Sequence, residues 1–181
     1  MRTLFNNSFY SQFQAPNASE IIDALENEEQ HIVQLSWANL CNVKTLGLHS
    51  EKYLPLIQPS LEIFFSDLNL PQVKYYMWDP WMNHYSRGGF QELHDHPKHE
   101  FVCVFFPNVG EDFGKFYFYD RNHIQVSNTW KDLTNFSERW IPDVKPGDIM
   151  FFPGHILHAV SPHNSDVVRK SFSANFNLIL D

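Results

Sequence analysis

The N-terminal part of the chain places its hydrophobic residues at helical spacing. In segment 17–29 (NASEIIDALENEE), Ile21, Ile22 and Leu25 fall on one side of a helix, and Asn17 or Ser19 can serve as its cap. We therefore predict an amphipathic helix over this segment, with its apolar side turned toward a core.

A second helix is predicted over residues 50–68. Its apolar residues recur three or four positions apart: Leu54, Ile57, Leu61, Phe64 and Phe65. Pro55 and Pro59 interrupt the pattern. Because proline lacks an amide hydrogen and clashes with the preceding turn, we expect this helix to start late or to kink.

Strand-like runs replace the helical pattern from Val73 onward. They are VKYYMW, FVCVFF, KFYFY, IMFF and VVRKSFSANFNLI, separated by turn-forming stretches such as PNVGEDFG and KPGD. Many short strands punctuated in this way are typical of a β-sandwich or β-barrel. We expect one domain over residues 1–181, with a helical support up to about residue 72 and a β core from about residue 73.

The last strand-like run alternates polar and apolar residues. One face carries Arg169, Ser171, Ser173 and Asn175, and the other carries Phe172, Ala174 and Phe176. A polar row that faces inward would be unusual in a plain core. It fits a barrel that holds a ligand.

Charge and cysteine content narrow the functional class. The formal charge of −8 leaves too little cationic surface to neutralise phosphates, so a general nucleic-acid binder is not expected. Cys41 and Cys103 form neither a disulfide framework nor a zinc site by themselves. The N-terminus shows no secretion pattern, and the longest apolar run is far shorter than a membrane span. We expect a cytoplasmic protein without a membrane partner.

Three histidines are candidate metal ligands. His94 and His96 stand two apart in QELHDHPKHE, so on a strand both would point to one face. His158 follows a later strand in FFPGHILHAVSP. Two ligands from one strand and one from a distant strand form a three-ligand face. Such a face leaves metal positions open for substrate and oxygen, as in the non-haem iron oxygenases.

Arg169 is a candidate anion-binding group. A guanidinium on the inner face of a barrel is costly unless it meets an anion, and its planar fork suits a carboxylate. Ser171, on the same face, is placed to share that carboxylate. With the histidines, this describes a pocket for a keto acid that chelates iron. The other interpretation is a buried ion pair between Arg169 and an acid of the chain, Asp148 or Glu100.

Together these residues resemble the Fe(II)- and 2-oxoglutarate-dependent dioxygenases, and within them the HxHP-type oxygenases of bacteria and phages. The motifs are WMNHY at Trp81–Tyr85, GG at Gly88–Gly89, HDHP at His94–Pro97, FYFYDR at Phe116–Arg121, PGDIMFFPGHILHAV at Pro146–Val160 and RKSFSANF at Arg169–Phe176. The resemblance implies a mainly β, double-stranded β-helix (jelly roll, cupin-like barrel) supported by N-terminal α-helices. It also implies an enzyme of a bacterium or a phage-infected cell. That enzyme would use Fe(II), 2-oxoglutarate and O2 to hydroxylate a substrate and release succinate and CO2.

The resemblance also assigns the cosubstrate site. It implies that Arg169 binds the distal carboxylate of 2-oxoglutarate and that Ser171 assists. Asn83 and Tyr85 precede His94 at a spacing similar to that in the DNA-alkylation repair members, where such residues contact the cosubstrate.

The second metal ligand departs from the family pattern, which is His-x-Asp/Glu followed by a distant His. The resemblance puts iron on His94 and His158, but His96 occupies the position of the acid, and Asp95 directly follows His94. We favour a face of His94, His96 and His158. In the alternative, the backbone bends and Asp95 binds the metal.

Cupins are the competing family because they share the jelly-roll shape. Their first motif, Gly-x5-His-x-His-x3-Glu, is met by Gly88, His94, His96 and Glu100. Glu100 would then be a metal ligand, and the protein would not use 2-oxoglutarate. The Arg169-x-Ser171 pair argues against this interpretation, as does Pro107 at the position of a later cupin glycine.

The substrate is left open between a peptidyl group and a small molecule, as is homo-oligomerisation. Candidate residues of the substrate rim are Trp81, His99 and Arg121. Segment 120–140 is either a lid over the site or a surface insertion. The aromatic residues expected to shield the site, or to serve as ordinary core, are Phe105, Phe151, Phe172 and Phe176.

Overall fold

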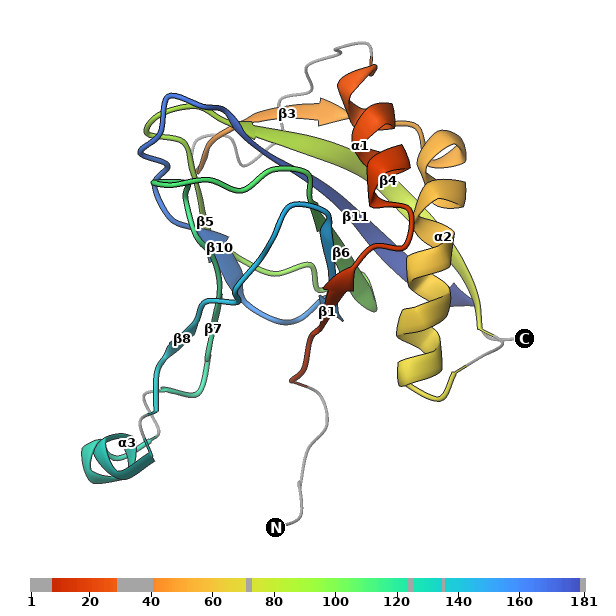
Figure 1. Ribbon diagram of the computed structural model, residues 1–181. Helices are drawn as coiled ribbons and strands as arrows, with labels where there is room; N and C mark the ends of the chain where they lie inside the picture. Colours follow the sequence, from red (N-terminus) through yellow and green to blue (C-terminus); the bar gives the residue numbers. More distant parts are fainter. Residues whose placement is uncertain (1–7, 29–40, 71–72, 124–125, 135, 180–181) are drawn as a thin grey trace.

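Two antiparallel sheets face each other in the computed structural model, which describes residues 8–28, 41–70, 73–123, 126–134 and 136–179 (Figure 1). The first sheet has the order β1 (Ser11–Gln14), β9 (Asp148–Pro153), β6 (Phe101–Phe106), β11 (Arg169–Ile179), β4 (Lys74–Tyr85) and β3 (Lys44–Gly47). The second has the order β2 (Cys41–Asn42), β5 (Phe90–His94), β10 (His158–Val160), β7 (Phe116–Tyr119) and β8 (Arg139–Trp140). The predicted mainly β jelly roll is confirmed.

Two helices cover the outer face of the first sheet, as Figure 1 shows. The first, α1, spans Ala18–Glu26 and buries Ile21 and Leu25 as the sequence predicts. Asn17 occupies the cap position but forms no side-chain cap bond. Its Nδ2 instead donates to the carbonyl oxygen of Leu56 at 3.0 Å, which ties α1 to the second helix.

The second helix, α2, spans Ser50–Asp67 and contains both Pro55 and Pro59, so the expected late start is wrong. Each interior proline costs roughly 3 kcal/mol. Burying a large apolar side chain contributes about 1.5–3 kcal/mol. The buried hydrophobic side chains of α2 are Tyr53, Ile57, Leu61, Phe64 and Phe65. Their burial outweighs the two prolines and keeps the helix continuous.

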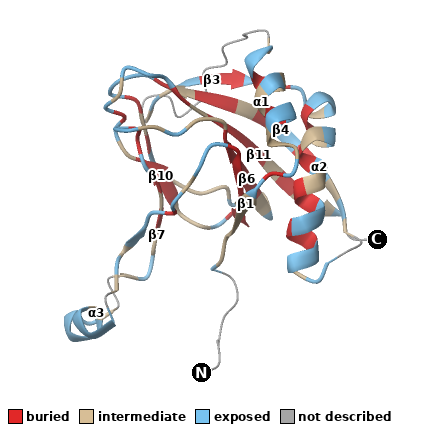
Figure 2. Cartoon of the chain, viewed as in Figure 1, coloured by how far each residue is buried: buried red, intermediate tan, exposed pale blue. Residues whose placement is uncertain are grey.

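The alternation of β11 separates two hydrophobic clusters. Phe172, Ala174 and Phe176 pack with α2 and α1, and all three are fully buried. The polar residues of the same strand face the second sheet. Between the sheets lies a second cluster, which includes Phe106, Phe116, Phe118, Met150 and Phe152. Figure 2 shows these buried positions along the sheets and on the inner side of α2.

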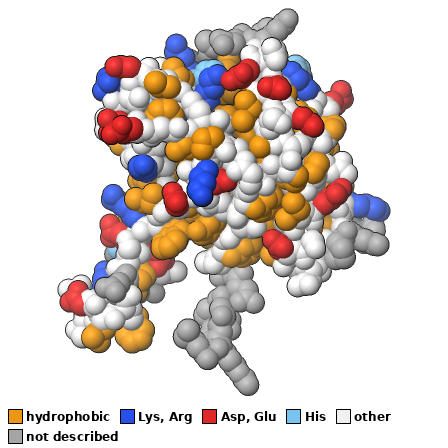
Figure 3. Space-filling view, in the orientation of Figure 1, with side chains coloured by type: hydrophobic (Ala, Val, Ile, Leu, Met, Phe, Trp, Pro, Cys, Tyr) orange, Lys and Arg blue, Asp and Glu red, His pale blue; other side chains and the backbone are white. Residues whose placement is uncertain are grey.

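The described residues of segment 120–140 form an arm that projects from the jelly roll (Figures 1 and 2). Strands β7 and β8 form its base, and a third helix, α3 (Asn128–Thr134), lies at its tip and has no buried residue. Trp130 and Leu133 are 59% and 76% exposed, and Figure 3 shows hydrophobic atoms at this tip. Within the described residues, no helix has both the length and the apolarity needed to cross a membrane.

Candidate metal centre

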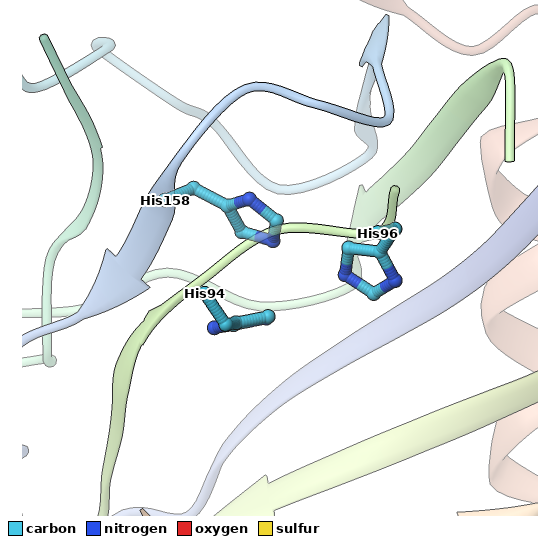
Figure 4. A group of neighbouring side chains, drawn as sticks. All are labelled: His94, His96 and His158. Atoms are coloured by element: carbon cyan, nitrogen blue, oxygen red, sulfur yellow. The ribbon is translucent and has the colours of Figure 1, made fainter. Parts of the chain in front are cut away.

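Three histidines converge between β5 and β10. His94 is the last residue of β5, and His158 is the first residue of β10 and pairs directly opposite it. His96 lies in the loop after β5. One ring nitrogen from each histidine lies within 4.8 Å of the other two. Figure 4 shows the three rings turned toward one another.

The position of His96 depends on the loop backbone, because β5 ends at His94. The predicted convergence of His94 and His96 is present, but strand alternation is not its cause. The amide of His96 donates to the carbonyl oxygen of Gly154 at 2.6 Å, so the loop is held against the turn that precedes His158. A Cβ atom at Gly154 would collide with the carbonyl oxygens of His96 and His99, so this close approach requires glycine.

Backbone carbonyls orient two of the three rings. His94 Nδ1 lies 2.7 Å from the carbonyl oxygen of Glu92, and His158 Nδ1 lies 2.9 Å from that of Ile156. A carbonyl oxygen only accepts, so both Nδ1 atoms carry the hydrogen. The lone pair of each neutral ring is therefore on Nε2. This tautomer is the one that a carbonyl partner gives to metal-binding histidines.

Burial favours the neutral form of all three rings. It lowers the pKa of His94 and holds the pKa of His158 well below its ordinary value. Burial also lowers the pKa of His96 to about 3, with smaller contributions from the charges of His94 and His99. Neutral imidazole nitrogens are ligands for divalent transition metals such as iron. The donor set therefore fits the metal that the sequence predicts.

Aromatic side chains of the inner cluster surround the histidines. The rings of Phe152 and Phe116 lie 4.9 and 5.6 Å from the ring of His158. Phe105, Phe151, Phe172 and Phe176, which the sequence left open between shielding the site and ordinary core, all belong to the cluster under the helices. They are therefore ordinary core, because successive residues of a strand point to opposite faces of the sheet.

Arg169 lies in the same cavity as the three histidines. It is 4% exposed, and its Cζ atom lies 4.6 Å from the ring centroid of Tyr85. Its Nη1 atom is buried without a hydrogen-bond partner among the described residues. Burial lowers the pKa of this guanidinium, but from a value so high that it stays charged.

The alternative of an ion pair between Arg169 and an acid of the chain is not what the structure shows. Asp148 Oδ2 accepts from the Lys145 amide and from Gln12 Nε2, both at 2.9 Å. Glu100 Oε2 accepts from the Leu178 amide at 3.0 Å. Both acids therefore have other partners.

Polar residues continue from Arg169 along the cavity. Ser171 pairs with Asn83 across β11 and β4, and both line the cavity with Tyr85. Asn83 Oδ1 accepts from Thr45 Oγ1 at 3.0 Å, and the Tyr85 hydroxyl donates to Gln91 Oε1. The cavity thus brings together the histidines and all four predicted cosubstrate residues. Sequence reasoning missed Thr45 and Gln91, because single polar residues on short strands carry no pattern.

The two alternative acidic ligands lie outside the histidine group. Asp95 Oδ2 is 2.6 Å from Nη2 of Arg121, in an ion pair that links the histidine loop to the arm. Of the predicted rim residues, only Trp81 lines the cavity, and its ring stacks 5.9 Å from that of His96. Arg121 lines a separate hollow of about 410 Å³ at the base of the arm. His99 Nδ1 lies 2.7 Å from Asn177 Oδ1, outside the cavity lining.

Fold and cavity together define a class. A jelly roll that encloses three clustered histidines and a buried arginine fits a metal-dependent oxygenase, because a three-ligand face leaves metal positions open for substrate and oxygen. Residues 79–175, more than half of the chain, match the family model described as "Putative 2OG-Fe(II) oxygenase", and the chain belongs to this family of Fe(II)- and 2-oxoglutarate-dependent oxygenases.

Solved structures share this fold at low sequence identity. An oxidoreductase of the 2OG-Fe(II) oxygenase family from Burkholderia pseudomallei is 14% identical with a TM-score of 0.67, covering 93% of this chain and 84% of its own. A prolyl-4-hydroxylase from Pseudomonas putida is 14% identical with a TM-score of 0.63, covering 94% and 92%. The carbocyclase SnoK from nogalamycin biosynthesis is 15% identical with a TM-score of 0.65, covering 97% and 81%. No curated protein sequence matches the chain.

Proposed function

We propose that this 2-oxoglutarate-dependent oxygenase is a hydroxylase whose iron is held by His94, His96 and His158. We further propose that Arg169, with Ser171, holds the distal carboxylate of 2-oxoglutarate. Asn83 and Tyr85 complete the cosubstrate pocket. Family membership supports the use of Fe(II) and 2-oxoglutarate, and the cavity supports the assignment of residues.

The observation that carries the proposal is the buried Nη1 of Arg169 in the cavity that the three histidines line. A buried guanidinium without an anion costs several kcal/mol. A dicarboxylate that reaches from the histidines to Arg169 would supply the missing anion. A cupin that binds metal alone would leave this cost uncompensated, which is why we prefer the oxygenase over the cupin alternative.

Each side chain has a defined task in this assignment. The Tyr85 ring lies under the guanidinium and orients it by a cation–π contact, while its hydroxyl is held by Gln91. Ser171 offers a hydroxyl beside Arg169 on the same face of β11. When bound, Fe(II) and 2-oxoglutarate would allow O2 to oxidise the substrate. One oxygen atom of O2 would pass to the substrate and the other to succinate, and CO2 would be released. Phe116 and Phe152 exclude water from the histidines during this step.

The proposal is tested by titrating the metal-loaded protein with 2-oxoglutarate in a calorimeter. We expect Arg169→Ala to weaken binding by at least about tenfold, since a charge-assisted hydrogen bond contributes about 1.5–3 kcal/mol. Metal stoichiometry should stay that of the wild type. Equal affinities for 2-oxoglutarate would overturn the role of Arg169. Hydroxylation itself is tested by the mass of the product once a substrate is found.

A further inference from the structure

A row of cross-strand pairs runs along the inner face of the first sheet, from Arg169 to the open end of the jelly roll. The pairs are Tyr85 with Arg169, Asn83 with Ser171, Trp81 with Ser173, Trp78 with Asn175 and Tyr76 with Asn177. A bulge adds one residue to β4 between Trp81 and Trp78, so both tryptophans lie on this face. The proposed cosubstrate pocket uses only the first two pairs.

The remaining pairs, without Asn177, form what we name the outer row: Trp81, Ser173, Trp78, Asn175 and Tyr76. It begins beside the metal centre, where the Trp81 ring stacks on that of His96. It ends in the open, because Trp78 and Tyr76 are 43% and 40% exposed and their rings lie 5.2 Å apart. The outer row carries no charged side chain. It therefore offers no opposite charge to a phosphate or a carboxylate.

Two buried polar atoms of the outer row have no hydrogen-bond partner among the residues that the structure describes. One is the donor Nε1 of Trp81, and the other is the acceptor Oδ1 of Asn175. An unsatisfied buried polar atom costs about 1–3 kcal/mol. Asn177, by contrast, is fully engaged, since its Oδ1 contacts His99 and its Nδ2 donates to the carbonyl oxygen of Lys98.

We propose that the outer row binds the primary substrate as an extended peptide segment. Trp81 Nε1 donates to a carbonyl oxygen of the peptide, and Asn175 Oδ1 accepts from an amide N–H. This inference rests on the proposed function and deepens it by naming the substrate class. Peptide amide groups offer both the acceptor and the donor that these two atoms lack.

The spacing of the outer row also fits a peptide. Residues on one face of a strand repeat every two positions, about 6.6–6.8 Å apart, and alternate side chains of an extended peptide have the same repeat. A peptide that follows β4 and β11 would place successive side chains against Trp81, Trp78 and Tyr76. The aromatic faces suit apolar side chains. Because Trp81 contacts His96, the residue held at Trp81 would lie beside the metal centre.

The test follows the indole N–H signals of the isotope-labelled full chain, with zinc in place of iron. Trp81→Phe identifies the Trp81 signal among those of the five tryptophans. The probes are N-methyl-phenylacetamide and methyl phenylacetate, in which oxygen replaces the only amide N–H. We expect the amide to shift the Trp81 signal and to bind about tenfold more tightly than the ester, because the ester leaves Asn175 Oδ1 unpaired.

Asn175→Leu should remove this preference, so that amide and ester bind equally. Asn177→Leu is the matched control and should keep it, because that side chain is already engaged by His99 and Lys98. Unchanged indole signals from the other tryptophans show that each variant is folded. Equal binding of both probes by the wild type would overturn the inference, as would no shift of the Trp81 signal. Tighter binding of methyl glucoside, a sugar probe without an amide group, than of the amide probe would also overturn it.

Titration of the same samples with 2-oxoglutarate separates this inference from the proposed function. If wild-type protein binds 2-oxoglutarate but does not distinguish the probes, only the peptide assignment fails. If it does not bind 2-oxoglutarate, the proposed function fails. The indole signals still decide on the peptide, because they are recorded with metal alone as well as with metal and 2-oxoglutarate.

Discussion

The guanidinium of Arg169 lies over the aromatic ring of Tyr85, with 4.6 Å between Cζ and the ring centroid. Both side chains are buried in the inner layer of the jelly roll, and the Tyr85 hydroxyl is held by Gln91. Tyr85 therefore fixes the direction of a cation whose Nη1 has no partner among the described residues.

Tyr85→Leu should weaken 2-oxoglutarate binding about 2- to 30-fold, because it removes a cation–π contact of about 0.5–2 kcal/mol. Tyr85→Phe keeps the ring and should have the smaller effect. Calorimetric titration of the metal-loaded variants measures both. If Tyr85→Phe weakens binding more than Tyr85→Leu, the hydroxyl rather than the ring orients Arg169, and our account of this pair is wrong.

Metal affinity should depend on the three clustered histidines and not on the nearby His99. His158→Ala removes one of three nitrogen donors and should lower the affinity for Fe(II) by at least about tenfold. Mutating a residue that only hydrogen-bonds to a metal ligand already costs about 10- to 100-fold in affinity. His99→Ala is the matched control, because His99 contacts Asn177 and lies outside the cluster. Competition with a chelating dye gives both affinities. Equal losses in the two variants would contradict the assignment.

The second ligand position is tested by changing His96 and Glu100. His96→Asp should retain the metal, since a carboxylate there restores the usual family pattern, whereas His96→Ala should lose affinity. Glu100→Gln should leave metal affinity unchanged, because Glu100 Oε2 accepts from the Leu178 amide. A large loss of metal in Glu100→Gln, measured by the same competition, would favour the cupin alternative.

Part of this site could be predicted from sequence because its pattern is local. The polar and apolar faces of β11 follow from strict alternation, and the three histidines stand in short motifs. Other features depend on contacts between distant segments. The loop at His96 is held by Gly154, and the bulge in β4 places Trp78 and Trp81 on one face, where strict alternation would put them on opposite faces.

Short strands limited the prediction of the fold in the same way. Strands of two to five residues, such as β2 and β5, contain too few positions to show a period. Helix α2 continues through Pro55 and Pro59 because its buried face stabilises it, and helix propensities do not include such tertiary burial. The identity of the shielding residues, Phe116 and Phe152, required knowing which face of each strand is turned inward.

Away from the site, Glu28 should make stability depend on pH. Burial raises its pKa, but hydrogen bonds from Lys52 and Tyr53 and the Lys52 charge outweigh burial and hold the pKa below its ordinary value. A lowered folded-state pKa stabilises the protein above about pH 4.3, the usual pKa of Glu, and that stabilisation is lost as the pH falls further.

Glu28→Gln should therefore lower the free energy of unfolding by about 1 kcal/mol at neutral pH. The difference from the wild type should shrink as the pH falls through the folded-state pKa. Urea unfolding at a series of pH values measures it. A difference that is independent of pH would show that the carboxylate charge does not contribute.

The central claim is that one cavity binds iron through His94, His96 and His158 and 2-oxoglutarate through Arg169. It is tested most directly by an anaerobic titration with Fe(II) and then 2-oxoglutarate, followed in the visible spectrum. We predict a weak charge-transfer band that requires both additions and that is reduced in Arg169→Ala. Metal binding without such a band would contradict the account and favour a metal-binding cupin.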